Sequence, residues 1–230
     1  MVAEASTGGN WRGLEIISRG ANRLCARDPR DPAHCLKFEL SPVERSRVGI
    51  RQRVLRWVGR HIPRFGDNRT ELRAYRKLRT RLAERTDGYL AACHGVVEAG
   101  NGPALRCDCV VLEDGSPARS LYRHLFEGPR LPAEELCAAV DAFEGWLLEN
   151  DVPLFDLNAG NFVVVPRGDA LALVCIDTKS VLSGKEILPF SRWSRRLMQR
   201  KIRRRAQRLR QRIADASANS TELAGRPPSH

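Results

Sequence analysis

Short apolar segments separated by turn residues occupy the first forty positions. Leu14, Ile16 and Ile17 are apolar, the letters S-R-G interrupt them, and the apolar pattern resumes over residues 23–26. The letters D-P-R-D-P at residues 28–32 indicate a turn, because proline fixes φ and aspartate side chains bond to nearby backbone groups. Residues 34–40 follow with a third apolar segment. The pattern predicts three antiparallel strands joined by turns.

The middle of the chain alternates between helical periodicity and short strands. Apolar residues recur at three-, four- and seven-residue spacings in three stretches, which predicts helices there. Two strands are expected around a glycine-rich turn, and a polar connector follows them as a hinge between two lobes. The expected helices cover residues 41–62, about 68 or 70 to 87, and 132–149; the strands cover 89–97 and 104–112; the connector is 113–117, and a short helix covers 120–126.

The last third of the chain predicts a compact pair of strands and a long helix. Strand segments are expected at residues 154–155, 162–165 and 171–176. A helix is expected over about 191–214, while residues 215–230 are rich in Ser, Ala, Pro and Gly and are expected to be disordered. The expected apolar stripe of that helix comprises Trp193, Leu197, Ile202, Ala206, Leu209 and Ile213.

Positive charge is concentrated in this last helix. The chain has 230 residues, 29% of them charged, and a net charge of +12. Eleven Lys or Arg residues and no acidic residue lie in residues 191–212, so the rest carries 12 − 11 = +1. Together with the basic helix at 41–64, this predicts binding to an anionic membrane surface or another polyanion, unless the charges form only a solvated face. The N-terminus has no secretory pattern, so a cytoplasmic protein is expected, with a peripheral place at the inner membrane as an option.

Seven cysteines are scattered without the spacing of a disulfide framework. Most lie among apolar neighbours, so reduced and buried thiols are expected. Cys93, His94, Cys107 and Cys109 suggest a zinc site as an alternative, but the paired C-x-x-C loops typical of such sites are absent.

Residues 154–177 carry the pattern with the clearest chemistry. The letters L-F-D-L-N-A-G-N-F-V-V-V place Asp156 and Asn161 five residues apart before an apolar strand, and a second apolar strand ends at Asp177. Phosphoryl transfer needs one carboxylate at the attacking hydroxyl, and an amide oxygen and a carboxylate to hold Mg²⁺. A hairpin would bring Asn161 and Asp177 together. An ordinary turn rich in Asp and Asn is the alternative.

This segment resembles the catalytic loop and metal-binding Asp of protein-kinase-like proteins. The letters D-P-R-D-P-A-H-C-L-K, R-T-E-L-R-A-Y-R-K-L, D-L-N-A-G-N and W-S-R-R-L-M-Q-R-K occur in an order that resembles the YrbL family of PhoP regulatory network proteins, over residues 14–210. The resemblance implies an α+β, two-lobed minimal kinase-like fold with a basic C-terminal helix. Its expected parts are an N-lobe at 12–113, which includes the basic insertion 41–64, a C-lobe at 114–214 and a disordered tail at 215–230.

The resemblance also assigns the upstream residues. Lys37 falls where the kinase strand lysine contacts the phosphates of ATP, and Glu71 falls where its ion-pair partner lies. Gly20 is expected at the turn over the phosphates, with Arg23 as an added cation. Each has an ordinary alternative: an amphipathic strand lysine, an exposed helix glutamate and a glycine of no special role.

The departures from kinases leave three functions open. The residues before Asp156 are Leu-Phe rather than His-Arg, and Asp177 is followed by Thr-Lys rather than Phe-Gly. Only 53 residues follow Asp177, so a full kinase C-lobe is not expected. The first prediction is a phosphotransferase using ATP and Mg²⁺, whose acceptor is a small molecule, a lipopolysaccharide-type sugar or a protein. The second is a catalytically inactive regulatory protein that binds a nucleotide or a partner, and the third is a basic adaptor.

Overall fold

The computed structural model describes residues 11, 13–41, 66–182 and 194–224, except for the side chains of 219–224. The predicted basic helix at 41–64 therefore lies outside the described residues, apart from position 41. The chain divides into two compact units. The first comprises residues 1–80 and 91–110, and the second comprises 81–90 and 111–230.

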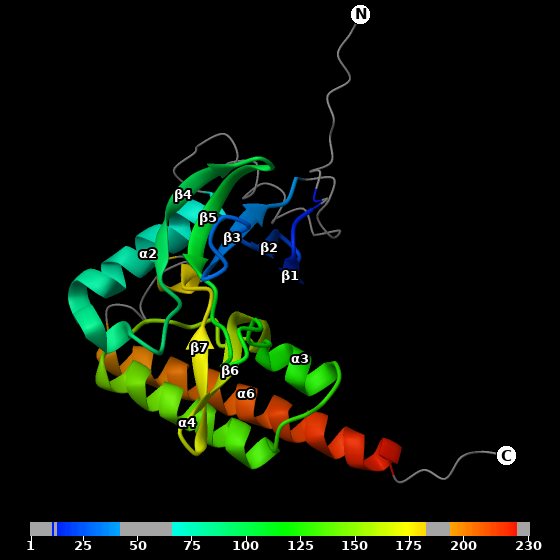
Figure 1. Cartoon of the computed structure of the whole chain (residues 1–230). Helices are drawn as coiled ribbons and strands as arrows, with labels where there is room; N and C mark the ends of the chain where they lie inside the picture. Colours follow the sequence, from blue (N-terminus) through cyan, green and yellow to red (C-terminus); the bar gives the residue numbers. More distant parts are fainter. Residues whose placement is uncertain (1–10, 12, 42–65, 183–193, 225–230) are drawn as a thin grey trace, which may run out of the picture. The chain divides into compact units, whose positions relative to one another are not determined.

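The first unit is built on a five-stranded antiparallel sheet with the order β1-β2-β3-β5-β4 (Figure 1). Its strands are β1 (Ile16–Arg19), β2 (Arg23–Arg27), β3 (His34–Glu39), β4 (Cys93–Ala99) and β5 (Gly102–Asp108). Alternation of side chains between the two faces separates Leu36 and Phe38 from Cys35 and Lys37 on β3. Leu36 and Phe38 pack in a core with Leu24, Ala26, Leu40 and Ala104, and Trp11 and Leu14 cover it.

Helix α2 (Asp67–Leu82) belongs to the same unit as far as residue 80, and its first turn is bonded to β3. The backbone amide of Asn68 donates to Glu39 Oε1 at 2.8 Å, so a carboxylate occupies the positive end of the helix. The side-chain Nδ2 of Asn68 donates to the carbonyl of Lys37 at 2.7 Å. These two bonds fix where the helix begins relative to the strand.

The second unit combines helices with the hairpin of β6 (Phe162–Arg167) and β7 (Ala170–Cys175). Helix α3 (Leu121–Phe126) begins after Ser120, whose hydroxyl accepts from the Arg123 amide. Helix α4 (Ala133–Glu149) buries the expected apolar face of Leu136, Val140, Phe143 and Leu147. Residues 81–90 belong to this unit because the Cys175 amide donates to the Tyr89 carbonyl at 2.8 Å.

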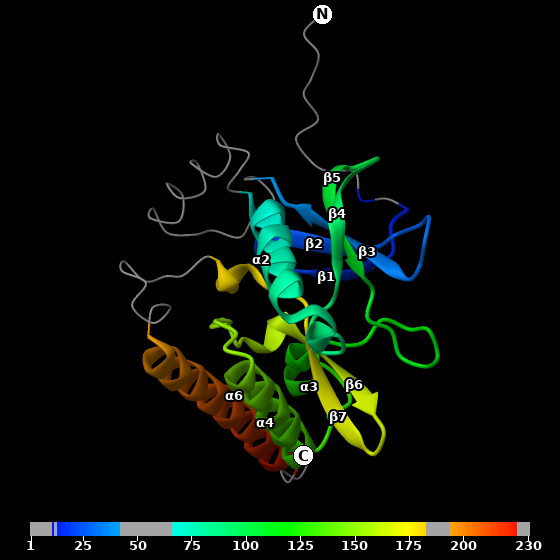
Figure 2. The ribbon, with the colours of Figure 1, turned by 90° about the vertical axis from the view of Figure 1, so that its left-hand side faces the viewer.

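The long basic helix α6 (Arg195–Ala224) packs beside α4, as Figures 1 and 2 both show. Ile202, Ala206, Leu209 and Ile213 are buried as expected. Leu197 is 45% exposed and Met198 is buried in its place, so that part of the predicted stripe is wrong by one residue. Trp193 lies outside the described residues. Arg210 anchors the helix to α4 through Asp141 at 2.6 Å and Glu144 at 2.7 Å.

The end of the last helix and the predicted strand at residues 154–155 differ from the structure. The helix was expected to end at 214 with a disordered tail after it, but α6 continues to Ala224 and buries Ala216. The cause is that no Gly or Pro interrupts the chain before Gly225. Residues 154–155 form no strand; Leu154 and Phe155 are buried in an irregular segment instead.

The α+β class and the basic C-terminal helix are confirmed. The first unit contains three strands, a helix and two further strands in chain order. The seven cysteines all lie within the described residues, where no disulfide joins them, and five of them are buried. Within the described part of the chain, no helix is both long and apolar enough to cross a bilayer.

Candidate functional site

In the first unit, Lys37 and Glu71 form a buried ion pair. Lys37 Nζ donates to Glu71 Oε1 at 2.7 Å, and the two side chains are 7% and 1% exposed. Burial alone would lower the pKa of the Lys37 ammonium, but negative charge on the Cys107 sulfur and on the Glu71 carboxylate raises the pKa well above its usual value. Lys37 therefore carries its charge throughout the neutral range.

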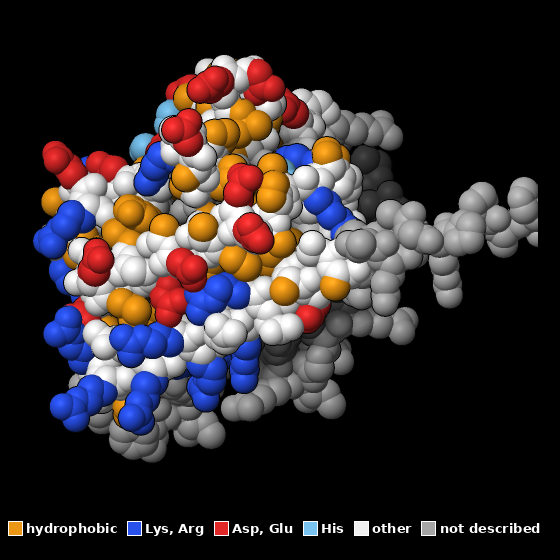
Figure 3. Space-filling model, turned by 90° about the horizontal axis from the view of Figure 1, so that it is seen from below, with side chains coloured by type: hydrophobic (Ala, Val, Ile, Leu, Met, Phe, Trp, Pro, Cys, Tyr) orange, Lys and Arg blue, Asp and Glu red, His pale blue; other side chains and the backbone are white. Residues whose placement is uncertain are grey.

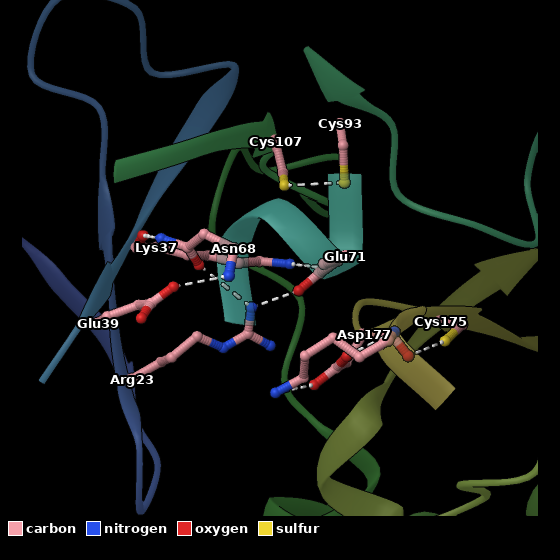
Figure 4. A network of polar contacts seen from close by, with 10 residues as sticks. Arg23, Lys37, Glu39, Asn68, Glu71, Cys93, Cys107, Cys175 and Asp177 are labelled. Carbon is pink, nitrogen blue, oxygen red and sulfur yellow. Dashed lines mark hydrogen bonds and ion pairs between the residues drawn. The ribbon is translucent and has the colours of Figure 1, made fainter. Parts of the chain in front are cut away.

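Glu71 binds a second cation, because Arg23 Nη1 also contacts its carboxylate, through Oε2 (Figure 4). The same Arg23 nitrogen lies 3.5 Å from Asn68 Oδ1. Glu71 thus holds two cationic side chains in a mostly buried place. Guanidinium and ammonium groups held in this way are suited to binding an anionic group such as a phosphate.

Gly20 lies in the turn between β1 and β2. Its amide donates to the Arg23 carbonyl at 2.8 Å, which closes the turn. A Cβ at Gly20 would meet only the Arg23 carbonyl oxygen, at 3.7 Å, so the backbone there is openly accessible. The turn does not require glycine for its conformation, and its predicted place over phosphates stays a prediction.

Two of the cysteines suggested as zinc ligands, Cys93 and Cys107, lie on the same face of the sheet as Lys37. Cys93 and Cys107 are directly opposite each other on β4 and β5, with their sulfurs 3.2 Å apart (Figure 4). His94 instead contacts Asp108 at 2.6 Å. The four residues of the suggested set are therefore divided between two faces of the sheet, and that set is wrong.

In the second unit, Asp156 and Asn161 belong to one closed turn. Asn161 Nδ2 donates to the Asp156 carbonyl at 3.0 Å, and the Asn161 amide donates to the Asn158 carbonyl at 2.8 Å. The amides of Phe155 and Asp156 both lie 3.2 Å from the Ser180 hydroxyl, which accepts from them. The Asp156 side chain is exposed. This geometry holds the backbone of the loop while it leaves the carboxylate accessible to a reactant.

The hairpin brings Asn161 and Asp177 to the same end of its ladder. Phe162 pairs with Cys175, and one residue further the Ile176 amide donates to the Asn161 carbonyl at 2.9 Å. Asp177 follows directly. Its carboxylate accepts from the Lys179 amide at 3.0 Å and lies 3.3 Å from the Lys179 ammonium. The expectation that a hairpin would bring Asn161 and Asp177 close is thus met within this unit.

The donor set of Asn161 and Asp177 fits a magnesium ion. Mg²⁺ prefers hard oxygen ligands and is held in proteins by one or two carboxylates, with other positions left to water and phosphate. Asp177 supplies a carboxylate, and Asn161 supplies an amide oxygen because its nitrogen is engaged with Asp156. The Lys179 ammonium competes for the same carboxylate, which is a feature that kinases with Phe-Gly at this place do not have.

The basic helix contacts the loop that carries Asp156. Lys201 Nζ lies 3.9 Å from the centre of the Phe155 ring, and Arg212 Nη1 lies 3.5 Å from Asn158 Oδ1. Residues on both sides of Asp156 therefore touch α6. Any ligand that displaces the helix would also disturb the loop.

Sequence reasoning missed several residues around these sites. Asn68 and Glu39 fix the first turn of α2, although the pattern had identified only a helix that starts near residue 68. An Asn at a predicted helix start was the available signal. The roles of Ser180 and Lys179 depend on backbone geometry after Asp177, for which the sequence offers no signal beyond the departure from Phe-Gly.

Comparison with known proteins gives one family and several distant structures. The model of the family "PhoP regulatory network protein YrbL" matches residues 12–214. No curated protein sequence matches the chain.

Among solved structures, a double mutant of the Mycobacterium tuberculosis PknI kinase domain matches with a TM-score of 0.43 and 18% identity over 79% of this chain and 64% of that chain. The PknI kinase domain without mutations has a TM-score of 0.39 and 20% identity over 76% and 63% of the two chains. WbdD has a TM-score of 0.46 and 15% identity, over 83% of this chain and 45% of that chain. The chain thus spans less than two thirds of the length of each of these proteins.

Proposed function

This chain belongs to the YrbL family of PhoP regulatory network proteins, and we propose that it binds Mg-ATP and transfers a phosphoryl group to a hydroxyl acceptor. The observation that carries the proposal is the buried Lys37–Glu71 pair. Removing a lysine and a glutamate from water costs several kcal/mol per ion, and hydrophobic residues of similar volume would serve stability as well or better. A strand lysine held by a helix glutamate is the phosphate-binding arrangement of protein kinases.

Each residue then has a defined task. Lys37 binds phosphate oxygens, Glu71 holds Lys37 in place, Arg23 adds a cation, and the turn at Gly20 lies close to the phosphates. Asp156 accepts the proton of the acceptor hydroxyl and orients it. Asn161 and Asp177 hold Mg²⁺, which when bound supplies neutralisation of phosphate charge. The acceptor class remains a small molecule, a lipopolysaccharide-type sugar or a protein.

Calorimetry with Mg-ATP tests this proposal. We expect the whole chain to bind ATP saturably and only in the presence of Mg²⁺. Lys37→Met and Asp177→Asn should each weaken this binding at least tenfold. Lys77→Met is the matched control, because Lys77 is an exposed lysine on α2. The absence of saturable binding, or equal binding by all variants, would reject the proposal. Transfer is then measured from radiolabelled ATP to a panel of sugars and proteins.

A second function is favoured by one specific observation. The Lys179 ammonium lies 3.3 Å from the Asp177 carboxylate, at the position where a kinase needs its metal. A chain that keeps this pair would bind a nucleotide weakly or without turnover and act as a regulatory protein. ATP binding without transfer to any acceptor, and without hydrolysis, would favour this function over catalysis.

The cations of α6 support a role at a polyanionic surface, such as the anionic face of the inner membrane in a cytoplasmic protein. The described helix exposes Arg195, Arg196, Arg200, Arg203, Arg204, Arg208 and Arg212. Figure 3 shows Lys and Arg side chains gathered along one border of this face of the molecule, where α6 lies. Each cation near an anionic membrane contributes about 1 kcal/mol. The segment at 41–64 is also basic, with seven Arg residues and Glu44, and lies outside the described residues.

A further inference from the structure

His34, His94 and Asp108 form a cluster on the sheet of the first unit. His34 begins β3, His94 lies near the start of β4, and Asp108 ends β5. His34 and Asp108 are paired directly across the two strands. Because successive side chains alternate between faces, His34 lies on the face of β3 opposite to Lys37. The cluster is therefore separate from the residues that the proposed function uses.

The ligand atoms of the cluster lie close enough to share one metal ion. His94 Nε2 is 2.6 Å from Asp108 Oδ1, and His34 Nε2 is 3.9 Å from the same oxygen. One atom from each of the three residues lies within 4.8 Å of the others. A tetrahedral zinc ion, with ligand bonds of about 2.0–2.2 Å, spaces its ligand atoms about 3.3–3.6 Å apart. The distance of 2.6 Å from His94 Nε2 to Asp108 Oδ1 is shorter than this spacing, and the distance of 3.9 Å from His34 Nε2 to the same oxygen is longer.

The surroundings orient His34 as a metal ligand. Its Nδ1 lies 2.8 Å from Asp31 Oδ2 and 3.2 Å from Arg106 Nη2. In the tautomer with the proton on Nδ1, this nitrogen donates to the nearer Asp31 carboxylate and Nε2 presents its electron pair. Metal-binding histidines typically donate their other ring N–H in this way. Arg106 lies on the Nδ1 side, where Asp31 at 2.9 Å and Asp28 at 3.1 Å balance its charge.

An irregularity in the sheet positions His94. The pairing of β4 with β5 steps from Cys93–Cys107 directly to Gly95–Arg106, so His94 is the extra residue of a bulge. Bulges re-aim side chains and are frequent beside functional sites. Here the bulge directs His94 to Asp108 while the preceding Cys93 stays buried. Three neighbouring strands thus direct three ligand-type side chains to one point.

We propose that His34, His94 and Asp108 bind one divalent transition-metal ion of the zinc class. Two imidazole nitrogens favour zinc and related metals over Mg²⁺ and Ca²⁺, which prefer oxygen ligands. Three protein ligands leave a further coordination position for water or an incoming group. The bound ion links the ends of β3, β4 and β5. Asp31 is a positioning residue, acting through His34.

Titration of the whole chain with Zn²⁺ after chelator treatment tests this proposal. We expect one site per chain with a dissociation constant of micromolar or below. His94→Gln, His34→Ala and Asp108→Asn each weaken it at least tenfold, and Asp31→Asn weakens it by about 10–100-fold. His124→Gln is the matched control, since His124 lies on α3 in the other unit. Zn²⁺ also raises the melting temperature of the parent, and less so that of the variants.

Replacement of Zn²⁺ by Co²⁺ distinguishes this site from binding by thiols. Ligation by nitrogen and oxygen gives visible d–d bands without the intense near-ultraviolet charge-transfer band of a cobalt thiolate. A thiolate band, the absence of saturable binding, or equal affinity in the parent and His94→Gln would overturn the proposal. His94 is 43% exposed, so His94→Gln is expected to fold even if His34→Ala does not. Mg-ATP binding is expected to be unchanged in His94→Gln, so this result is independent of the proposed function.

Discussion

The carboxylate of Asp177 and the ammonium of Lys179 lie 3.3 Å apart, and the Lys179 backbone amide donates to the same carboxylate at 3.0 Å. The two side chains are 17% and 21% exposed, so the attraction is neither fully screened nor strong. In the proposed function, Mg²⁺ and this ammonium would compete for the negative charge of the Asp177 carboxylate. Lys179 is therefore the residue to change in a test of metal binding by Asp177.

Replacing Lys179 by Met is expected to strengthen Mg-ATP binding about three- to tenfold, because a partly exposed pair of this kind contributes about 1 kcal/mol. The measurement is a calorimetric titration with ATP at fixed Mg²⁺. Lys77→Met, at an exposed position of α2, controls for the loss of one positive charge. Unchanged or weaker binding in Lys179→Met would show that the ammonium does not compete with the metal.

Glu71→Gln is expected to destabilise the protein by about 3–5 kcal/mol. The substitution leaves Lys37 and Arg23 without the buried carboxylate that both contact. Removing one partner of a buried ion pair destabilises a protein because the remaining charge is buried without compensation. The free energy of unfolding from urea denaturation measures the effect. Glu84→Gln, at an exposed glutamate after α2, should change stability by no more than about 0.5 kcal/mol.

The pH dependence of stability follows from the raised pKa of Lys37. A lysine whose folded pKa lies above its unfolded pKa of ~10.4 contributes its full stabilisation below that pH and loses it as the pH rises through the folded pKa. The difference in stability between the parent and Lys37→Met should therefore be constant from neutral pH to about 10 and shrink above it. Denaturation of both proteins across this range measures the difference. A difference that already falls between about pH 7 and 9 would mean that the pKa is not raised.

Much of the fold follows from local patterns, whereas the charge network does not. Alternation predicted β2 and β3, and periodicity predicted the buried face of α4, because each depends on near neighbours in the sequence. The contact of Arg23 with Glu71 depends on a helix docking 48 residues away, which no local pattern specifies. The choice between Leu197 and Met198 was wrong because spacings of three and four residues fit equally well near a helix end, and packing against α4 decides between them.

Asp156→Asn tests the catalytic function separately from binding. The Asp156 carboxylate is exposed, and the backbone of its loop is held by Ser180 and Asn161. The substitution keeps the shape and removes the proton acceptor, so we expect nearly unchanged Mg-ATP affinity and a transfer rate lowered by about 10²–10⁴-fold. Asp169→Asn, at an exposed position in the turn after β6, is the control. Equal rates in parent and Asp156→Asn would remove Asp156 from the mechanism.

The exposed and the anchored arginines of α6 should respond differently to substitution. Arg203, Arg204 and Arg208 are exposed, whereas Arg210 is bound to Asp141 and Glu144 on α4. Replacing the three exposed residues by Gln should weaken binding to anionic vesicles about a hundredfold, at about 1 kcal/mol for each charge, with little change in melting temperature. Arg210→Gln removes one charge but also the anchor, so it should lower the melting temperature while it weakens vesicle binding far less.

Co-sedimentation with anionic and with neutral vesicles, across a salt series, measures this difference. Attraction between exposed charges and a charged surface is screened over about 10 Å at 0.1 M salt, so binding through α6 must weaken steeply as salt is added. Because the apolar stripe of α6 is buried against the second unit, it is not available to insert into lipid while the helix stays docked. Binding that persists in high salt, or that the triple substitution leaves intact, would assign vesicle binding to another part of the chain and leave the cations of α6 as a solvated face.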